Sequence, residues 1–285
     1  MLSLKQLFDK NKCDKSSRHH YDEMYENILG SHRNSDKPFH LLEIGVLRGE
    51  STTAWLEYFN DNGKVSALDT FERVPMKDLP ESLVNNPRLT LHECDSTDQK
   101  QVNKSFGKHA PLFDCIIDDG LHRPVANGAS FKNLFPYLKP GGIYVVEDVF
   151  PLDIMTKDEL SFYWIKRYKE HYSVDLFKTA FMNVINAHDA DIESIERVDN
   201  RKKSGYLDSY AFVIKKKEVK EEEKAAPPVK KKRAPRKKKV VEPAIAPIIE
   251  PIIEPAIQKE ESKKKVSYVS PYFNLDNEND DTTPF

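Results

Sequence analysis

Two pairs of adjacent acids are the residues of this chain best suited to chemistry. Asp118 and Asp119 end the apolar run FDCIIDD, and Glu147 and Asp148 end the apolar run IYVVED. If these runs are neighbouring parallel strands, about 4.8 Å apart, four carboxylates meet at one rim of the sheet. Like charges this close repel each other, so a counter-charge is required. An all-oxygen cluster suits a hard divalent cation such as Mg²⁺.

The two acids of each pair should have different roles, because adjacent strand residues point to opposite faces of a sheet. We expect Asp119, Glu147 and Asp148 to bind the metal. We expect Asp118 to face the cofactor. His122 follows Asp119 by three residues, and a histidine beside a metal-bound hydroxyl can take its proton near neutral pH. His122 is therefore the predicted catalytic base, the alternative being a loop histidine that only caps the next helix.

A second set of candidate residues follows the earlier apolar runs, where an open parallel sheet binds ligands. The loop EIGVLRGES, residues 43–51, has two glycines that permit a tight turn and close approach to a ligand. It lacks the G-x-G-x-x-G fingerprint, which argues against NAD. A single aspartate at a strand end is as easily an ordinary turn residue. Glu43, Gly45, Gly49, Asp69 and Asp95, in this order at successive strand ends, together favour S-adenosylmethionine. The predicted cofactor-binding residues are Glu43, Gly45, Gly49, Ser51, Asp69, Asp95 and Asp118.

The segments that position these residues alternate between strand and helix patterns. Helices are predicted over 50–63 and 123–138, the second closed by Lys-Pro-Gly-Gly at 139–142. Continuous apolar strands between amphipathic helices indicate a parallel sheet covered on both faces. The predicted parallel strands span 39–46, 64–69, 88–95, 113–119 and 143–149.

The end of the folded region has a different pattern. Residues 151–180 are predicted to be mostly helical and are rich in aromatic residues, whereas 191–198 and 209–216 are predicted to form a hairpin. Five parallel strands and a terminal antiparallel hairpin give a mostly parallel seven-stranded sheet. This is the layout of the Rossmann-like, α/β class I methyltransferase fold.

The chain is predicted to have three regions. These are an N-terminal helical segment (1–37), a methyltransferase domain (38–216) and a disordered Lys/Pro-rich tail (217–285). Residues 215–285 carry 17 basic and 13 acidic side chains, against 27 and 33 in residues 1–214. Proline recurs every fourth residue from 243 to 255, which blocks helix and indicates an extended spacer.

The tail leaves a second class of function open. Its basic runs, 230–233 and 236–239, could bind nucleic acid, a protein or an import receptor. The acidic body without a basic stripe argues against a nucleic-acid substrate. Three cysteines without metal or disulfide spacing, and no signal peptide or membrane-spanning run, predict a cytoplasmic protein without membrane contact. Nuclear import through the basic run in a eukaryote stays open, as does an oligomer.

Three motifs carry a resemblance to a known family. The stretches LLEIGVLRGES, FDCIIDDGLH and LFPYLKPGGIYVVEDV resemble the metal-dependent sugar O-methyltransferases of the mycinamicin and macrocin type, and the related rhamnosyl and cephalosporin hydroxylase-like group. The N-terminal Asp14-Lys15-x-x-x-His19-x-Tyr21 followed by Tyr25 is similar to a stretch often found there. The resemblance implies S-adenosylmethionine, Mg²⁺ and a histidine base at His122, with Leu121 where the family commonly has serine.

The resulting prediction is an enzyme that methylates a hydroxyl of a sugar or another vicinal diol, a small-molecule or glycan substrate. A diol can chelate the cation through two oxygens, which orients and acidifies one of them. A catechol presents the same geometry and remains an alternative. Tyr163 and Trp164 are either an apolar platform for the substrate or core residues.

Overall fold

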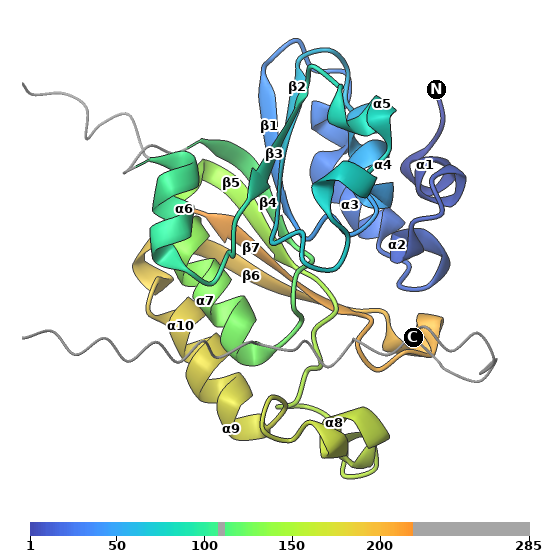
Figure 1. Cartoon of the computed structure of the whole chain (residues 1–285). Helices are drawn as coiled ribbons and strands as arrows, with labels where there is room; N and C mark the ends of the chain where they lie inside the picture. Colours follow the sequence, from blue (N-terminus) through green and yellow to red (C-terminus); the bar gives the residue numbers. More distant parts are fainter. Residues whose placement is uncertain (108–111, 219–285) are drawn as a thin grey trace, which may run out of the picture. The chain divides into compact units, whose positions relative to one another are not determined.

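Seven strands form a single sheet in the order β3-β2-β1-β4-β5-β7-β6 (Figure 1). This computed structural model describes residues 1–107 and 112–218, all within one compact unit of the chain. Strands β1 to β5 pair in parallel, whereas β7 is antiparallel to both β5 and β6. The predicted parallel sheet with a closing hairpin is therefore confirmed. The strands are β1 Phe39–Ile44, β2 Gly63–Asp69, β3 Leu89–Glu93, β4 Phe113–Asp118, β5 Leu138–Val146, β6 Ile192–Asp199 and β7 Tyr210–Lys216.

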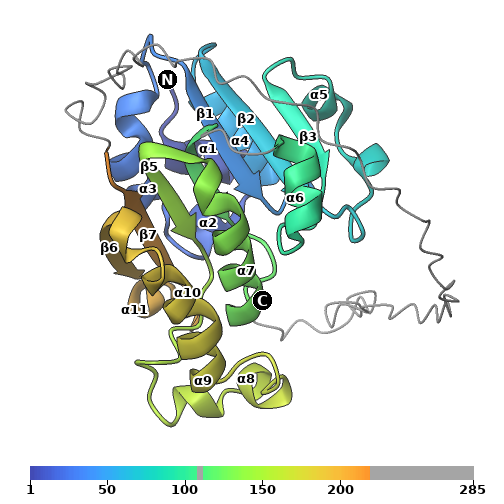
Figure 2. The ribbon, with the colours of Figure 1, turned by 90° about the vertical axis from the view of Figure 1, so that its left-hand side faces the viewer.

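Helices cover both faces of the sheet, as Figures 1 and 2 show. The alternation of side chains along the buried strands creates the two cores. Leu41 packs with the helices α1, α3 and α4, whereas its neighbour Leu42 packs with α7 on the opposite face. The helices are α1 Leu4–Lys10, α2 Asp14–Ser17, α3 Asp22–Leu29, α4 Glu50–Tyr58, α5 Glu81–Val84, α6 Gln99–Phe106, α7 Pro124–Leu134, α8 Tyr163–Arg167, α9 Val174–Leu176, α10 Asn183–Asn186 and α11 Arg201–Ser204.

The N-terminal segment packs into the core that contains Leu41 and helix α4. Trp55 of α4 is fully buried, with the ring of Phe8 at 5.1 Å and the ring of Tyr25 at 4.9 Å, both edge-on. The backbone N–H of Leu4 donates to Glu26 at 2.8 Å, which ties α1 to α3. The helices α1, α2 and α3 lie in this segment, and its polar side chains reach the sheet edge described below.

The sequence prediction was wrong at the start of β5. Lys-Pro-Gly-Gly at 139–142 does not close the preceding helix but lies inside the strand. Helix α7 ends at Leu134, and a 3₁₀ turn over Phe135–Tyr137 leads directly into β5. The pairing of β4 with β5 shifts register between Phe113 and Cys115, which accommodates the Pro-Gly-Gly sequence as a bulge.

The segment between β5 and β6 is only partly regular. It contains α8, α9, a π-helical stretch over Phe177–Met182 and α10. Tyr163 is 59% exposed, so the core interpretation of this residue is wrong, and Trp164 is half-buried against Tyr168. Within the described ranges no helix has both the length and the apolar character needed to span a bilayer. The predicted tail begins at residue 217, and its residues after Glu218 lie outside the described part of the chain.

Candidate active site

The carboxyl ends of β4 and β5 bring the two acidic pairs together. Asp118 pairs in register with Val146, and the backbone N–H of Glu147 donates to the carbonyl oxygen of Asp118 at 3.0 Å. The predicted adjacency of the two pairs is therefore correct. It follows from the parallel pairing of β4 with β5, which ends both strands at one edge of the sheet.

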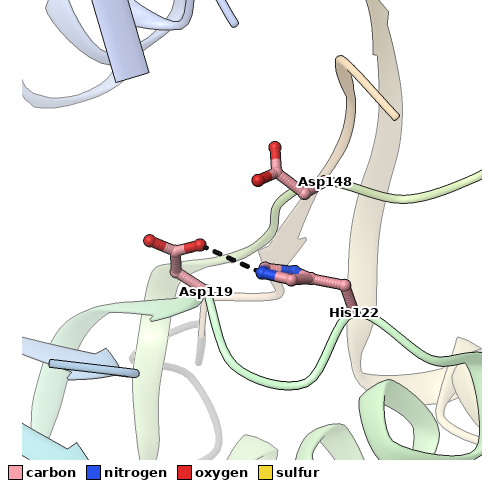
Figure 3. A group of neighbouring side chains, drawn as sticks. All are labelled: Asp119, His122 and Asp148. Carbon is pink, nitrogen blue, oxygen red and sulfur yellow. Dashed lines mark ion pairs between the residues drawn. The ribbon is translucent and has the colours of Figure 1, made fainter. Parts of the chain in front are cut away.

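Three side chains converge beyond these strand ends, as Figure 3 shows. Asp119, His122 and Asp148 each offer a ligand atom, and these atoms all lie within 4.8 Å of one another. His122 Nε2 lies 3.6 Å from Asp119 Oδ1. Two carboxylates and one imidazole form a donor set that can hold a divalent cation. We call Asp119, His122 and Asp148 the convergent group.

The backbone at two of these residues adopts a strained conformation. His122 and Asp148 both have φ of +52°, a left-handed conformation that is uncommon for residues other than glycine. Each such residue costs about 1–3 kcal/mol, and such strain clusters at functional sites. The Nδ1 atom of His122 is also buried and has no hydrogen-bond partner within the described part of the chain. Both features fit a group arranged for a ligand.

Glu147, predicted as a third metal ligand, has other partners. Its side chain is 1% exposed and contacts Lys15 Nζ through Oε2 and the Tyr25 hydroxyl through Oε1. Lys15 Nζ also lies 2.5 Å from Asp119 Oδ2. Glu147 is thus occupied by Lys15 and Tyr25. The convergent group contains His122 but not Glu147.

The same N-terminal segment holds Asp148. The Tyr21 hydroxyl donates to Asp148 Oδ1 at 3.0 Å, and His19 Nδ1 lies 3.2 Å from that oxygen. His19 Nδ1 is also 2.9 Å from Ser209 Oγ, just before β7. Burial lowers the pKa of His19 to about 3, so the ring is neutral at pH 7. The sequence alone assigns no role to these residues, although the Asp14 to Tyr25 stretch carries part of the family resemblance.

The first loop lies directly against the convergent group. Gly45 has φ of +90°, and a Cβ there would lie 2.1 Å from the carbonyl oxygen of Asp119. Gly49 has φ of +83°, and a Cβ there would lie 2.2 Å from Leu83 Cδ2. Only glycine fits both positions, so the loop can bring its backbone close to a ligand.

Two predicted cofactor residues support this loop from inside. Glu43 is fully buried and accepts hydrogen bonds from Thr52 Oγ1 at 2.5 Å and Trp55 Nε1 at 3.0 Å. Burial raises the pKa of Glu43. Ser51 is buried in the first turn of α4. Both residues lie at the base of the loop that Gly45 and Gly49 shape.

The strand-end aspartates form turns around the same edge. Asp69 accepts from the N–H groups of Val46 at 2.8 Å and Leu47 at 3.2 Å, so it fixes the first loop. Asp95 accepts from the N–H and hydroxyl of Thr97 at 2.8 and 2.7 Å.

Asp118 lies below this edge, in the interior. It is buried, accepts from Asn127 Nδ2 at 3.4 Å and has its pKa raised to about 7 by burial. Its carboxyl therefore contributes less fixed negative charge to the rim than the sequence suggested.

Comparisons with known proteins agree with this architecture. Residues 42–149 match a family described as a methyltransferase domain. The chain is 30% identical over 138 residues to mycinamicin VI 2''-O-methyltransferase of Micromonospora griseorubida, covering 46% of this chain and 32% of that protein. It is 32% identical over 147 residues to 8-demethyl-8-alpha-L-rhamnosyl tetracenomycin-C 2'-O-methyltransferase of Streptomyces olivaceus, covering 49% of this chain and 36% of that protein.

A solved structure shares the fold. The MycE methyltransferase from the mycinamycin biosynthetic pathway, in complex with Mg, SAH and mycinamycin VI, superposes with a TM-score of 0.56. The two chains are 20% identical, and the superposition covers 80% of this chain and 57% of that one. The matched part is only about a third of the length of the curated relatives, at 32% and 36%.

Proposed function

Because residues 42–149 match a methyltransferase-domain family, we propose that this chain is an S-adenosylmethionine-dependent O-methyltransferase that requires a divalent cation. The acceptor is a hydroxyl of a sugar or of another vicinal diol. The two curated relatives that match over about half of this chain are named as O-methyltransferases of mycinamicin VI and of a rhamnosyl tetracenomycin, and MycE was solved with Mg and SAH.

The observation that carries the proposal is the convergent group beside the first loop. Asp119, His122 and Asp148 place their ligand atoms within 4.8 Å of one another, and Gly45 lies against the backbone of Asp119. A cation held by Asp119 and Asp148, with His122 beside it, and a cofactor held by the first loop would therefore be neighbours. This arrangement would bring the acceptor hydroxyl, His122 and the methyl group of the cofactor together, which methyl transfer requires.

Different residues of the site would have different roles in such a reaction. When bound, S-adenosylmethionine supplies the methyl group, and the cation lowers the pKa of a hydroxyl that it binds. Asp119 and Asp148 would hold the cation, with Tyr21 and His19 fixing the carboxylate of Asp148. His122 takes the proton of the acceptor hydroxyl at Nε2, the ring nitrogen that faces Asp119.

Ligand-induced stabilisation of the full chain tests this function. S-adenosylhomocysteine should raise the melting temperature whereas NAD should not, because a ligand that binds only the folded state stabilises it. Mg²⁺ should add a further increment that a chelator reverses. A melting temperature that does not respond to S-adenosylhomocysteine would remove the methyltransferase assignment.

A further inference from the structure

Arg123, which directly follows His122, is a buried arginine whose Nε has no hydrogen-bond partner among the described residues. The residue is 7% exposed, and its Nε is buried without a hydrogen-bond acceptor. Within residues 1–107 and 112–218 its guanidinium makes no hydrogen bond, ion pair or ring contact. Buried charges in proteins are normally paired, because an unpaired one loses its hydration without compensation. The missing partner of Arg123 is therefore expected to be an anion that comes with a ligand.

The start of helix α7 provides a second anion-binding feature at the same place. Arg123 is the N-cap residue of this 11-residue helix, and Pro124 occupies its first turn. No side chain in the described part of the chain caps the helix. Its first N–H groups and its dipole therefore favour a negative charge at this end. Val125, in the first turn, is 51% exposed, so the helix end is reachable from solvent.

A histidine from another element lies within electrostatic range of Arg123. Burial and the charge of Arg123 lower the pKa of His171, between α8 and α9. The only acid paired with His171 among the described residues is Glu170, whose Oε1 lies 3.7 Å from His171 Nε2 and whose side chain is 58% exposed. Glu170 makes no ion pair with Arg123, so the guanidinium stays available.

We propose that Arg123 and the N-terminus of α7 form a subsite for a carboxylate or phosphate group of the acceptor. A guanidinium binds both groups through two parallel hydrogen bonds. The Cα atoms of Arg123 and His122 are neighbours along the chain, about 3.8 Å apart. The charged group and the hydroxyl that loses its proton would then belong to one acceptor molecule. The acceptor class is an anionic diol, such as a uronic acid or a sugar phosphate.

The assignment to the acceptor rests on the proposed function, but the anion subsite can be tested without turnover. The full chain, in chelator and without cofactor, is titrated calorimetrically with D-glucuronate, glucose 1-phosphate and neutral D-glucose. The same titrations are run on Arg123→Met and Arg123→Lys, and S-adenosylhomocysteine binding is measured for all three proteins. Chelator keeps the anions from binding through a metal ion.

We expect the wild type to bind an anionic sugar more tightly than glucose. Arg123→Met should lose about 10- to 100-fold in that affinity, the usual worth of a hydrogen bond to a charged group, and Arg123→Lys should lose less. Arg123→Met should melt no lower than the wild type, because replacing an unpaired buried charge by an apolar side chain removes a penalty.

Three results would overturn the proposal. One is equal binding of glucuronate, glucose 1-phosphate and glucose by the wild type. Another is Arg123→Met melting well below the wild type, which would make Arg123 a structural residue. The third is loss of S-adenosylhomocysteine binding alone in Arg123→Met, which would assign the guanidinium to the carboxylate of the cofactor. Failure of every protein to bind S-adenosylhomocysteine, with anion binding intact, would instead contradict the proposed function.

Discussion

Lys15 Nζ lies 2.5 Å from Asp119 Oδ2, although 104 residues separate the two in the sequence. The same ammonium contacts Glu147, and the Lys15 side chain is only 2% exposed. A permanent positive charge of the protein therefore neutralises part of the carboxylate cluster at the ends of β4 and β5. The carboxylates therefore have a counter-charge, as the sequence predicts, but Lys15 supplies part of it and not a metal ion alone.

Replacing Lys15 by methionine should destabilise the protein. Asp119 and Glu147 would lose their counter-charge, and breaking a buried pair in this way costs about 3–5 kcal/mol. The free energy of unfolding, measured by urea denaturation in the presence of chelator, gives this cost. Lys10→Met is the matched control, because Lys10 Nζ pairs with Glu57 Oε1 at 2.8 Å on the surface. That exposed pair should contribute less than about 1 kcal/mol. Equal losses in the two variants would show that the Lys15 contacts are unimportant.

His122→Asn separates a catalytic base from a metal ligand. If His122 takes the proton, the rate of methyl transfer should fall by about 10²- to 10⁴-fold. Metal and S-adenosylhomocysteine affinities should then stay near those of the wild type. Both quantities are measured, the rate with an acceptor once one is identified and the affinities by calorimetry. A loss of metal affinity as large as the loss of rate would make His122 a ligand of the ion and remove its role as base.

Gly45→Ala should weaken both the fold and cofactor binding. The added Cβ would lie 2.1 Å from the carbonyl oxygen of Asp119, so the first loop or the residue after β4 must shift. Gly205→Ala is the control, because Gly205 has φ of +83° but has no atom within 4 Å of an added Cβ. Both variants incur the left-handed strain of about 1–2 kcal/mol, and only Gly45→Ala adds the clash. Thermal unfolding and S-adenosylhomocysteine titration compare the two, and identical behaviour would refute the close approach.

Acid should destabilise the protein through His40, on β1. Its Nε2 lies 3.0 Å from Ser66 Oγ, and burial lowers its pKa to about 4. In the unfolded chain the pKa of histidine is about 6.5. Between these values the unfolded state binds more protons, so stability is full above about pH 6.5 and is lost as pH falls toward 4. His40→Gln should lose less unfolding free energy between pH 7.5 and 5 than the wild type. A variant with an unchanged pH dependence would contradict this.

The parallel part of the sheet could be predicted from the sequence because its strands are short runs rich in apolar residues and bounded by turn residues. The acid after each run then falls at a sheet edge, which is why Asp69, Asp95, Asp118 and Asp148 were placed correctly at strand ends. Their partners were harder to predict. Nothing local in the sequence shows that Asp69 holds the backbone of Val46 rather than a ligand.

The inner wall of the site could not be predicted because its contacts are long-range. Lys15 meets Glu147 across 132 residues, and Tyr21 meets Asp148 across 127. Local patterns carry no information about such pairs, although the resemblance of the Asp14 to Tyr25 stretch to a known family pointed to this segment. The sequence predicts all three residues of the convergent group at this site, with His122 as base, but it does not predict that Glu147 contacts Lys15.

Titration of the full chain with Mn²⁺, followed by the paramagnetic resonance signal of the free ion, tests the central claim most directly. Mn²⁺ accepts carboxylate and imidazole ligands and stands in for Mg²⁺. The wild type should bind about one ion per chain, and Asp148→Asn should bind it at least about tenfold more weakly while remaining folded. Asp78→Asn, an exposed acid outside the convergent group, should bind like the wild type. Equal binding by Asp148→Asn and the wild type, or no binding by either, would contradict a metal-dependent site at the ends of β4 and β5.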